Sequence, residues 1–424
     1  MIVYLVCYAA SLLLALGRHY LLSGAGLLAA AAYLYASDYI RSGNLLHLRG
    51  IFALSFVGGQ GLACMKLSYL SQAWSAGTWL GLLAAFAGFY LAFYYLEAFS
   101  GEASVRVGGH SGAVQRRGLE SYAGTVFFCA VALAALSAGC FAIEAVYMGY
   151  IPLLLRGVPH AYSYFHVTGL HYLTVSCVLV PALSVIYFCI EGGRSRGRLV
   201  CMLLADAAAV AIPLLCVSRS QLLFAILLAL ITYMQMEHQL NPIYVVFALA
   251  GLIVLYILLT IARSHDTAYL NTVFEMKRHL PIFVTQPYIY IANNYDNFDC
   301  LVKGLVAPFW TLTGLKFLVP SLTAFPYYVT KEELTTLTMF YDAYYDFGVI
   351  GVFVFSALLG SAAYLLMRMM RQVQNPITYL LYAQFALYML LSFFTTWFSN
   401  PSTWFYFAVT AVVTFLVSHK IAGR

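Results

Sequence analysis

The sequence predicts an all-α polytopic membrane protein with about twelve transmembrane helices and one large external loop. Composition is the first reason: 63% of the residues are hydrophobic and only 9% are charged, whereas about a quarter of a soluble domain is charged. The mean hydropathy of +0.84 would leave a soluble fold with extensive apolar surface in water. Continuity is the second reason, because the apolar residues form long stretches rather than the alternating pattern of a membrane β-barrel.

Each predicted span is a stretch that a helix can carry across the bilayer, since about 20 residues rising about 1.5 Å each cover the hydrocarbon core. The predicted spans cover residues 2–16, 20–38, 51–66, 77–97, 122–147, 168–190, 199–217, 221–236, 243–262, 346–367, 377–398 and 403–419. The third is the weakest, because Gly58, Gly59, Gln60 and Gly61 interrupt its apolar run. The chain start has no basic segment and no cleavage site, so we expect the first span to be retained. Residues 1–424 are expected to form a single integral membrane domain.

One polar segment, residues 263–345, separates the ninth and tenth predicted spans. Lys and Arg in short loops resist translocation and therefore mark the cytoplasmic side. If loop 98–121 is cytoplasmic and every span crosses once, more than half of the 22 basic residues fall on that side. They are Arg41, Arg49, Arg106, Arg116, Arg117, Arg194, Arg196, Arg198, Arg368, Arg371, Lys420 and Arg424. The pattern predicts that both termini are cytoplasmic and that 263–345 is a large external loop.

Two short external loops then carry candidate binding residues. Arg156 and His160 follow the fifth span among prolines and glycines; an arginine suits phosphate oxygens, and a histidine can move a proton near neutral pH. Arg219 lies in the tight connection between the seventh and eighth spans, where ionisable residues often line a site. Each arginine could equally serve as an anchor at the lipid headgroups.

The large loop supplies further candidates at its two ends. Arg263 directly follows the ninth span, and an arginine there can stabilise charge that develops on a phosphate leaving group. His265 and, at the far end, Asp342 are candidate proton acceptors. The alternative is a solvated helix end at Arg263 and an acidic helix start that complements the helix dipole, which suits Asp346 best.

Aromatic and amide side chains run through the same loop. Tyr345 and its aromatic neighbours, beside Asn294 and Asp296, would suit sugar faces and sugar hydroxyls. The aromatic belt at a membrane interface explains many of these rings equally well.

Several classes of function find little support. The sequence contains no phosphate-binding loop and no zinc-type spacing, and nothing indicates nucleic acid. Eight of the nine cysteines lie in or beside apolar spans, where cysteine acts as a small apolar residue. Intramembrane ionisable residues are few, namely Asp206, Glu144 and His171, which gives thin support for a transporter.

Several short motifs occur in a fixed order along the chain, and this order indicates a resemblance. Gly149-Tyr150-Ile151-Pro152-Leu153-Leu154 follows a mid-chain span, Thr168-Gly169-Leu170 opens the next, Ser218-Arg219-Ser220 forms a short turn, the large loop starts at Arg263, and Tyr345-Asp346-Phe347-Gly348-Val349-Ile350-Gly351 closes it. In this order and topology the chain resembles the Wzy-type oligosaccharide repeat-unit polymerases, which make O-antigen and capsular polysaccharides. The resemblance covers roughly residues 120–400.

The resemblance implies a GT-C-like helical bundle in the bacterial inner membrane and a metal-independent glycosyltransferase without a cofactor. Its substrate would be an undecaprenyl-diphosphate-linked oligosaccharide, its surroundings membrane lipids, and its partners a flippase and a chain-length regulator. Arg219 and Arg263, and less directly Arg156, would bind the diphosphate. The arginine-x10-glycine pattern of some members is absent after Arg263 and Arg278, so the general base stays open between His265 and Asp342. An O-antigen-type ligase and a flippase of lipid-linked sugar are the alternative functions.

Overall fold

A computed structural model of the chain describes residues 1–67, 71–100, 118–155, 161–191, 195–237, 294–296, 298, 304–323 and 337–422. Between residues 238 and 293 it describes only positions 243, 246, 247, 250, 251 and 254, which are helical. Most of the predicted ninth span, 243–262, therefore lies outside the described residues.

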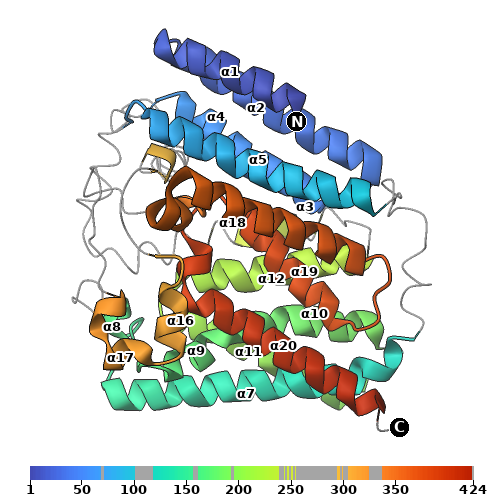
Figure 1. Cartoon of the computed structure of the whole chain (residues 1–424). Coiled ribbons are helices and arrows are strands. Elements are labelled where there is room, and N and C mark those ends of the chain that lie inside the picture. The colour runs from blue at the N-terminus through green and yellow to red at the C-terminus, as the bar shows by residue number, and fades with distance from the viewer. Residues whose placement is uncertain are drawn as a thin grey trace. The chain divides into compact units, whose positions relative to one another are not determined.

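Every regular element among the described residues is a helix, and no strand occurs there (Figure 1). In the part of the chain that the structure describes, eight helical stretches are long and apolar enough to cross a membrane: α2 (Tyr20–Ser42), α5 (Ala76–Phe99), η2 with α7 (Glu120–Met148), α9 to α10 (Leu170–Ile190), α11 (Arg196–Leu215), α12 (Arg219–Glu237), α18 (Tyr341–Met369) and the Pro401–His419 part of α20 (Pro401–Ala422). The same described ranges hold three shorter apolar stretches, α1 (Ile2–Leu16), α3 to α4 (Leu48–Cys64) and α19 (Ile377–Leu390). These helices confirm the predicted class, an α-helical polytopic membrane protein.

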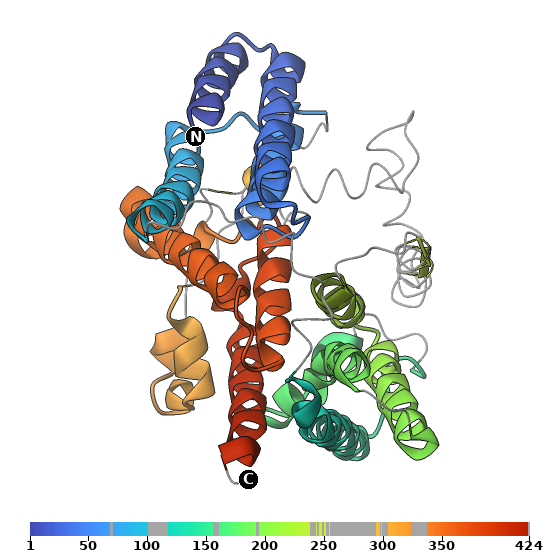
Figure 2. The ribbon, with the colours of Figure 1, turned by 90° about the vertical axis from the view of Figure 1, so that its right-hand side faces the viewer.

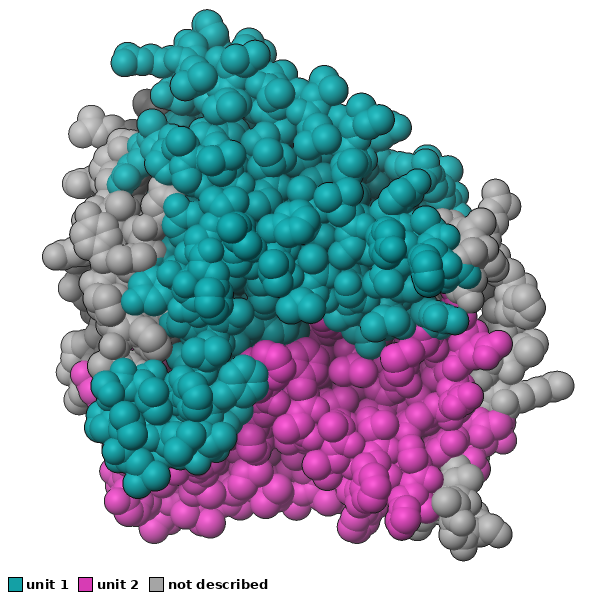
Figure 3. Space-filling view, in the orientation of Figure 1, with its two compact units in different colours: residues 1–109, 268–368, 388–403 teal, residues 110–267, 369–387, 404–424 magenta. Residues whose placement is uncertain are grey.

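The chain forms two compact units, each assembled from segments far apart in the sequence and coloured separately in Figure 3. Unit 1 comprises residues 1–109, 268–368 and 388–403. Unit 2 comprises residues 110–267, 369–387 and 404–424.

Unit 1 begins with an antiparallel pair, α1 and α2 (Figure 2). The two helices exchange hydrogen bonds, because Ser11 Oγ donates to the Ser23 carbonyl at 2.7 Å and Ser23 Oγ donates to the Ser11 carbonyl at 2.8 Å. Small residues also let α2 approach α4 (Gly58–Cys64) closely, since a Cβ on Gly24 would overlap the Gly61 carbonyl. Close backbone contact of this kind is typical of helix packing in membranes.

The predicted third span is one continuous helical stretch despite its glycines. It consists of α3 (Leu48–Phe52), the π-helical turn η1 (Ala53–Val57) and α4. The glycines lower the hydrophobicity of this stretch, but they do not break the helix. Neighbouring chain segments occupy the space that larger side chains would fill.

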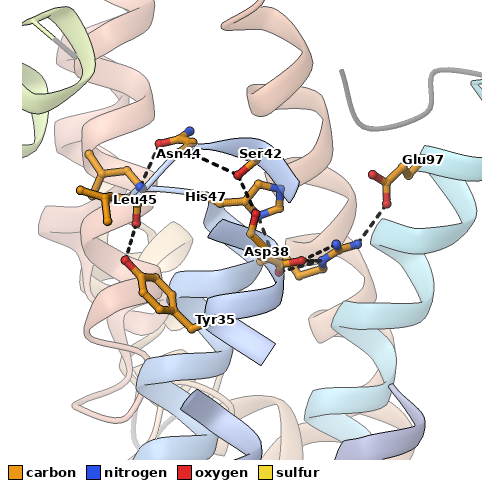
Figure 4. Close-up of polar contacts among 9 residues, drawn as sticks. Tyr35, Asp38, Ser42, Asn44, Leu45, His47 and Glu97 are labelled. Atoms are coloured by element: carbon orange, nitrogen blue, oxygen red, sulfur yellow. Dashed lines mark hydrogen bonds and ion pairs between the residues drawn. The ribbon is translucent and has the colours of Figure 1, made fainter. Parts of the chain in front are cut away.

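A charged cluster joins the ends of α2, α3 and α5 (Figure 4). The buried guanidinium of Arg49 donates to Asp38 Oδ1 at 2.6 Å from Nη2 and to Glu97 Oε2 at 3.0 Å from Nη1. His47 lies beside the same carboxylate, with Nδ1 3.7 Å from Asp38 Oδ2. Burial lowers the pKa of His47 to about 4, which outweighs the favourable charge of Asp38. The imidazole is therefore neutral at pH 7, and Arg49 forms ion pairs with both carboxylates.

The predicted eleventh span, 377–398, ends early in the structure. Helix α19 stops at Leu390, and its 14 residues reach only about 21 Å. The chain then turns through residues 391–396, with Thr395 at φ 58°, before the 3-10 turn η5 (Trp397–Ser399) and α20.

The carbonyls of four successive residues at this break, 390–393, each accept a hydrogen bond from a donor in unit 1. Ser55 Oγ donates to the Leu390 carbonyl at 2.5 Å, and Trp397 Nε1 donates to the Leu391 carbonyl at 2.9 Å. The backbone N–H of Met339 donates to the Ser392 carbonyl at 3.1 Å, and Asn294 Nδ2 donates to the Phe393 carbonyl at 2.6 Å. Irregular backbone in an apolar bundle is stable only when such partners are present.

Unit 2 contains a group of helices whose ends define the candidate site. Helix α7 (Ala123–Met148) packs against α9 (Leu170–Val175), α10 (Val180–Ile190) and α11, and α10 packs against α12. Alternating chain direction brings the end of α7, the start of α9, the end of α11 and the start of α12 to one end of this group.

Candidate functional site

Arg219 opens α12 at that end of unit 2. It follows a turn in which Val217 has φ 56° and the backbone N–H of Ser218 donates to the Pro213 carbonyl at 2.9 Å. The Arg219 side chain is partly exposed, whereas Val217 and Leu222 on either side of it are buried. A fixed cation is thus held at the edge of an apolar helix group, next to the first backbone N–H groups of α12.

The loop after α7 is bound to this same turn. Gly149 ends α7 in the left-handed conformation (φ 75°), which redirects the chain away from the helix. Four residues later the backbone N–H of Leu153 donates to the Leu215 carbonyl at 3.0 Å, at the end of α11. A hollow of about 430 Å³ lies beside this loop and is lined by apolar residues, among them Ala145, Tyr150 and Leu154.

Residues 161–169 precede α9 in the sequence and pack against the turn that contains Arg219. Tyr162 packs against Val217 and Leu222. The ring of Phe165 lies 5.6 Å from that of Tyr150 and 5.7 Å from that of Phe141. These contacts carry the chain across the end of the helix group before Gly169 (φ 86°) opens α9.

A buried carboxylate and a histidine lie where this segment ends. Glu144 of α7 is 0% exposed and accepts a hydrogen bond from the Val167 backbone N–H at 3.0 Å. Both carboxylate oxygens are 3.2 Å from Nδ1 of His171 on α9. The sequence marks these residues only as scarce intramembrane ionisable groups; their pairing depends on the packing of α7 against α9.

In unit 1, residues 294–296 and Phe298 of the predicted external loop are packed into the helix group. Asn294 and Tyr295 are 0% exposed, and Tyr295 donates from its hydroxyl to the Phe56 carbonyl in the π-helical turn at 2.5 Å. The ring of Tyr295 lies against Gly59, and the ring of Phe298 lies against Gly81. The predicted sugar-facing residues Asn294 and Asp296 thus make their described contacts within the protein.

Asp296 is held by three donors. Its carboxylate forms an ion pair with Lys66, accepts from Trp74 Nε1 at 2.8 Å and accepts from the Gln72 backbone N–H at 3.1 Å. The Lys66 ammonium also lies over the Trp74 ring, 4.7 Å from its centroid. Burial raises the pKa of Asp296 and lowers the pKa of Lys66, while the ion pair opposes both shifts. A cavity of about 70 Å³ adjoins Lys66 and Trp74 and has room for little more than ordered water.

Asp342 and Tyr345 lie on α18, which begins five residues before the predicted tenth span. Asp342 is 0% exposed and accepts a hydrogen bond from Ser399 Oγ. Tyr345 packs beside Leu337 and Tyr341. Asp346 accepts from the Leu305 backbone N–H at 2.6 Å, and the helix is interrupted two residues later at Gly348 (φ 61°, ψ −153°).

The other predicted site residues, Arg156, His160, Arg263 and His265, lie outside the described residues. Among those described, Arg219 belongs to unit 2, whereas Asn294, Asp296, Asp342 and Tyr345 belong to unit 1. The described residues contain no group of three or more His, Cys, Asp or Glu side chains arranged to hold a metal ion.

No protein-family model, curated protein or solved structure matches the chain. The arrangement of its own residues is therefore the basis for a functional proposal.

Proposed function

We propose that this chain polymerises oligosaccharide repeat units carried on undecaprenyl diphosphate, at the outer leaflet of the bacterial inner membrane. The proposal includes a bundle of twelve spans of the GT-C-like type, cytoplasmic termini and an external loop 263–345. It rests on the resemblance of motif order together with one structural observation in unit 2.

That observation is the hydrogen bond from the Leu153 N–H to the Leu215 carbonyl, 3.0 Å long. It ties the loop containing Gly149 to Leu154 to the turn that carries Arg219. The third motif, Thr168-Gly169-Leu170, starts α9 at the same end of the helix group. Three motifs separated in the sequence thus lie at one end of the same helix group, together with a fixed cation, and this supports a shared role in binding one substrate.

The chemistry of this surface suits a lipid diphosphate. A guanidinium group binds phosphate oxygens through paired N–H donors, and its charge stabilises the leaving diphosphate as the glycosidic bond breaks. The apolar hollow beside Tyr150 offers a place for the first part of a polyprenyl chain. Arg263 of the external loop is proposed as a second cation on the diphosphate.

The sequence offers His265 and Asp342 as candidate general bases for this reaction. A general base must come within hydrogen-bond reach of the hydroxyl that it deprotonates. Because Asp342 is fully buried against Ser399, its position favours a role in holding α18 to the chain break at 391–400.

A deletion strain complemented with variants tests the function. We expect Arg219→Ala to abolish long polymer while single repeat units are still transferred, and Arg219→Lys to restore it in part, because lysine keeps the charge but not the paired donors. Arg18→Ala is the matched control, since Arg18 is an exposed arginine in another predicted external turn. Long polymer at normal expression of Arg219→Ala would overturn the assignment of Arg219.

The phenotype of the deletion itself separates the alternatives. Loss of a polymerase leaves single repeat units attached to their final acceptor, whereas loss of a ligase leaves long chains unattached. Loss of a flippase leaves lipid-linked units on the cytoplasmic face.

A further inference from the structure

Glu144 and His171 form a pair that the proposed diphosphate site does not use. Glu144 lies in an otherwise apolar helix, and His171 is the one basic side chain that forms an ion pair with it among the described residues. An unpaired buried carboxylate costs several kcal/mol, so the pairing strongly fixes the imidazole. The carboxylate is completely buried, whereas the His171 side chain is 27% exposed.

This geometry leaves Nε2 as the nitrogen of the His171 ring that can accept a proton from a substrate. With Nδ1 directed at the carboxylate, the neutral ring carries its proton on Nδ1, and the lone pair is on Nε2. A buried carboxylate that orients an imidazole in this way also stabilises the imidazolium formed when Nε2 accepts a proton. Such a pair is suited to general base catalysis.

The pair is tied to the Arg219 turn through two contacts in unit 2. Val167, whose N–H binds Glu144, lies five residues after Tyr162, which packs on Val217. Cys216, a buried thiol three residues before Arg219, also interacts electrostatically with Glu144. The imidazole and the guanidinium therefore belong to one end of one unit.

Two other groups face the pair. His166 is exposed, with its ring 6.3 Å from that of His171, and Cys140 lies one helical turn from Glu144 on α7. Neither forms an ion pair with Glu144 in the structure, so the carboxylate acts on His171.

We infer that His171 is the general base of the reaction and that Glu144 is its positioning residue; this inference rests on the proposed polymerase function. Nε2 of His171 takes the proton from the acceptor sugar hydroxyl as that oxygen forms a bond to the anomeric carbon of the donor. The bond between this carbon and the diphosphate oxygen breaks, and its electron pair leaves with undecaprenyl diphosphate. The imidazolium then releases its proton to water, so the cycle yields the extended lipid-linked glycan, undecaprenyl diphosphate and one proton.

The test uses the purified full-length chain in proteoliposomes with a lipid-diphosphate-linked repeat unit. We expect His171→Gln to lower kcat by at least about 100-fold, the lower end of the usual contribution of a general base, while KM changes little. His419→Gln, at an exposed histidine near the end of α20, is the matched control. It should stay within about twofold of the wild type, as expected for a group that is not in contact with the reaction. His171→Ala with added imidazole should recover activity in proportion to the imidazole concentration, which a purely structural role would not produce.

Glu144→Gln gives the readout for positioning. Without the carboxylate the imidazolium is less stable, so the acidic limb of the kcat profile should move to lower pH and the maximal rate should fall. Unchanged pH profiles and an unchanged kcat for His171→Gln, in a wild type that makes polymer, would overturn this inference alone. A wild-type chain that makes no polymer from the lipid-linked unit would overturn the proposed function and this inference with it.

Discussion

Asn294 donates from Nδ2 to the carbonyl oxygen of Phe393 at 2.6 Å. The two residues are 99 positions apart, and the bond joins the predicted external loop to the chain break between α19 and α20. The described loop residues 294–296 and 298 are therefore part of the packed structure of unit 1 and do not lie only on its surface.

Replacing Asn294 with Leu should destabilise the protein by about 1–3 kcal/mol, because the buried carbonyl of Phe393 would lose its donor. The measurement is the unfolding midpoint in detergent. Thr313→Ala is the control: its hydroxyl is exposed and bonds only within its own turn, so the expected change is below about 0.5 kcal/mol. Equal midpoints for the wild type and Asn294→Leu would contradict this role of Asn294.

The ion pair between Lys66 and Asp296 should behave as a coupled buried pair. Lys66→Met leaves Asp296 as an uncompensated buried charge and should cost about 3–5 kcal/mol. Combining it with Asp296→Asn should recover much of that loss, because no charge then remains buried. A double-mutant cycle of unfolding free energies measures the coupling, and simple additivity of the two single changes would exclude it.

Acidification should destabilise the charged cluster at His47. The folded-state pKa of about 4 lies below the ordinary value of 6.5, so the unfolded chain binds a proton first as the pH falls. The stabilising contribution of neutral His47 is complete above pH 6.5 and is lost as the pH falls toward 4. At about 1.4 kcal/mol for each unit of pKa difference, the total loss is about 3 kcal/mol.

The difference between the wild type and His47→Phe isolates this contribution. We expect the Tm of the wild type to fall more steeply between pH 7 and pH 4 than the Tm of His47→Phe, whose ring can pack beside Phe93. His419→Gln, a change at an exposed histidine, should leave the slope as it is in the wild type. Parallel curves for the wild type and His47→Phe would refute the assignment.

The glycines at 59 and 81 should tolerate no larger residue. A Cβ at Gly59 would lie 2.5 Å from the Tyr295 hydroxyl oxygen, and a Cβ at Gly81 would overlap the Phe298 ring. Tyr295 cannot yield easily, because it is fully buried and its hydroxyl is bound to the Phe56 carbonyl. We expect Gly59→Ala and Gly81→Ala each to cost about 1–3 kcal/mol and to speed hydrogen exchange at residues 294–298.

Gly139→Ala on α7 is the control for helix propensity. A Cβ there meets no atom within 4 Å, so alanine should stabilise the helix by about 0.5–1 kcal/mol. If the alanine variants at 59 and 81 behaved like the variant at 139, the docking of Tyr295 and Phe298 against these glycines would be disproved.

The limits of sequence-based prediction are clearest at three positions. The sequence places the start of the tenth span at 346, since Asp342 is a charged residue beside a polar loop; the structure begins α18 at Tyr341, because Ser399 satisfies the Asp342 carboxylate from 57 positions away. The eleventh span appears continuous through 398 because Leu391 to Phe394 are mostly apolar, yet the helix ends at Leu390 where side chains from elsewhere bind its carbonyls. Lys66 is only the last residue of the predicted third span, 51–66, whereas the structure pairs it with Asp296.

By itself, the sequence determined that this chain is an α-helical membrane protein, because hydrophobic length and the need to pair backbone amides are local properties of each segment. It also singled out Arg219 through its place in a short turn. Only the tertiary structure decided which polar groups meet: Glu144 with His171, Lys66 with Asp296, and Asn294 with the Phe393 carbonyl. The reason is physical, since a buried polar group is stable only with a partner, and the identity of that partner depends on helix packing between residues distant in the sequence.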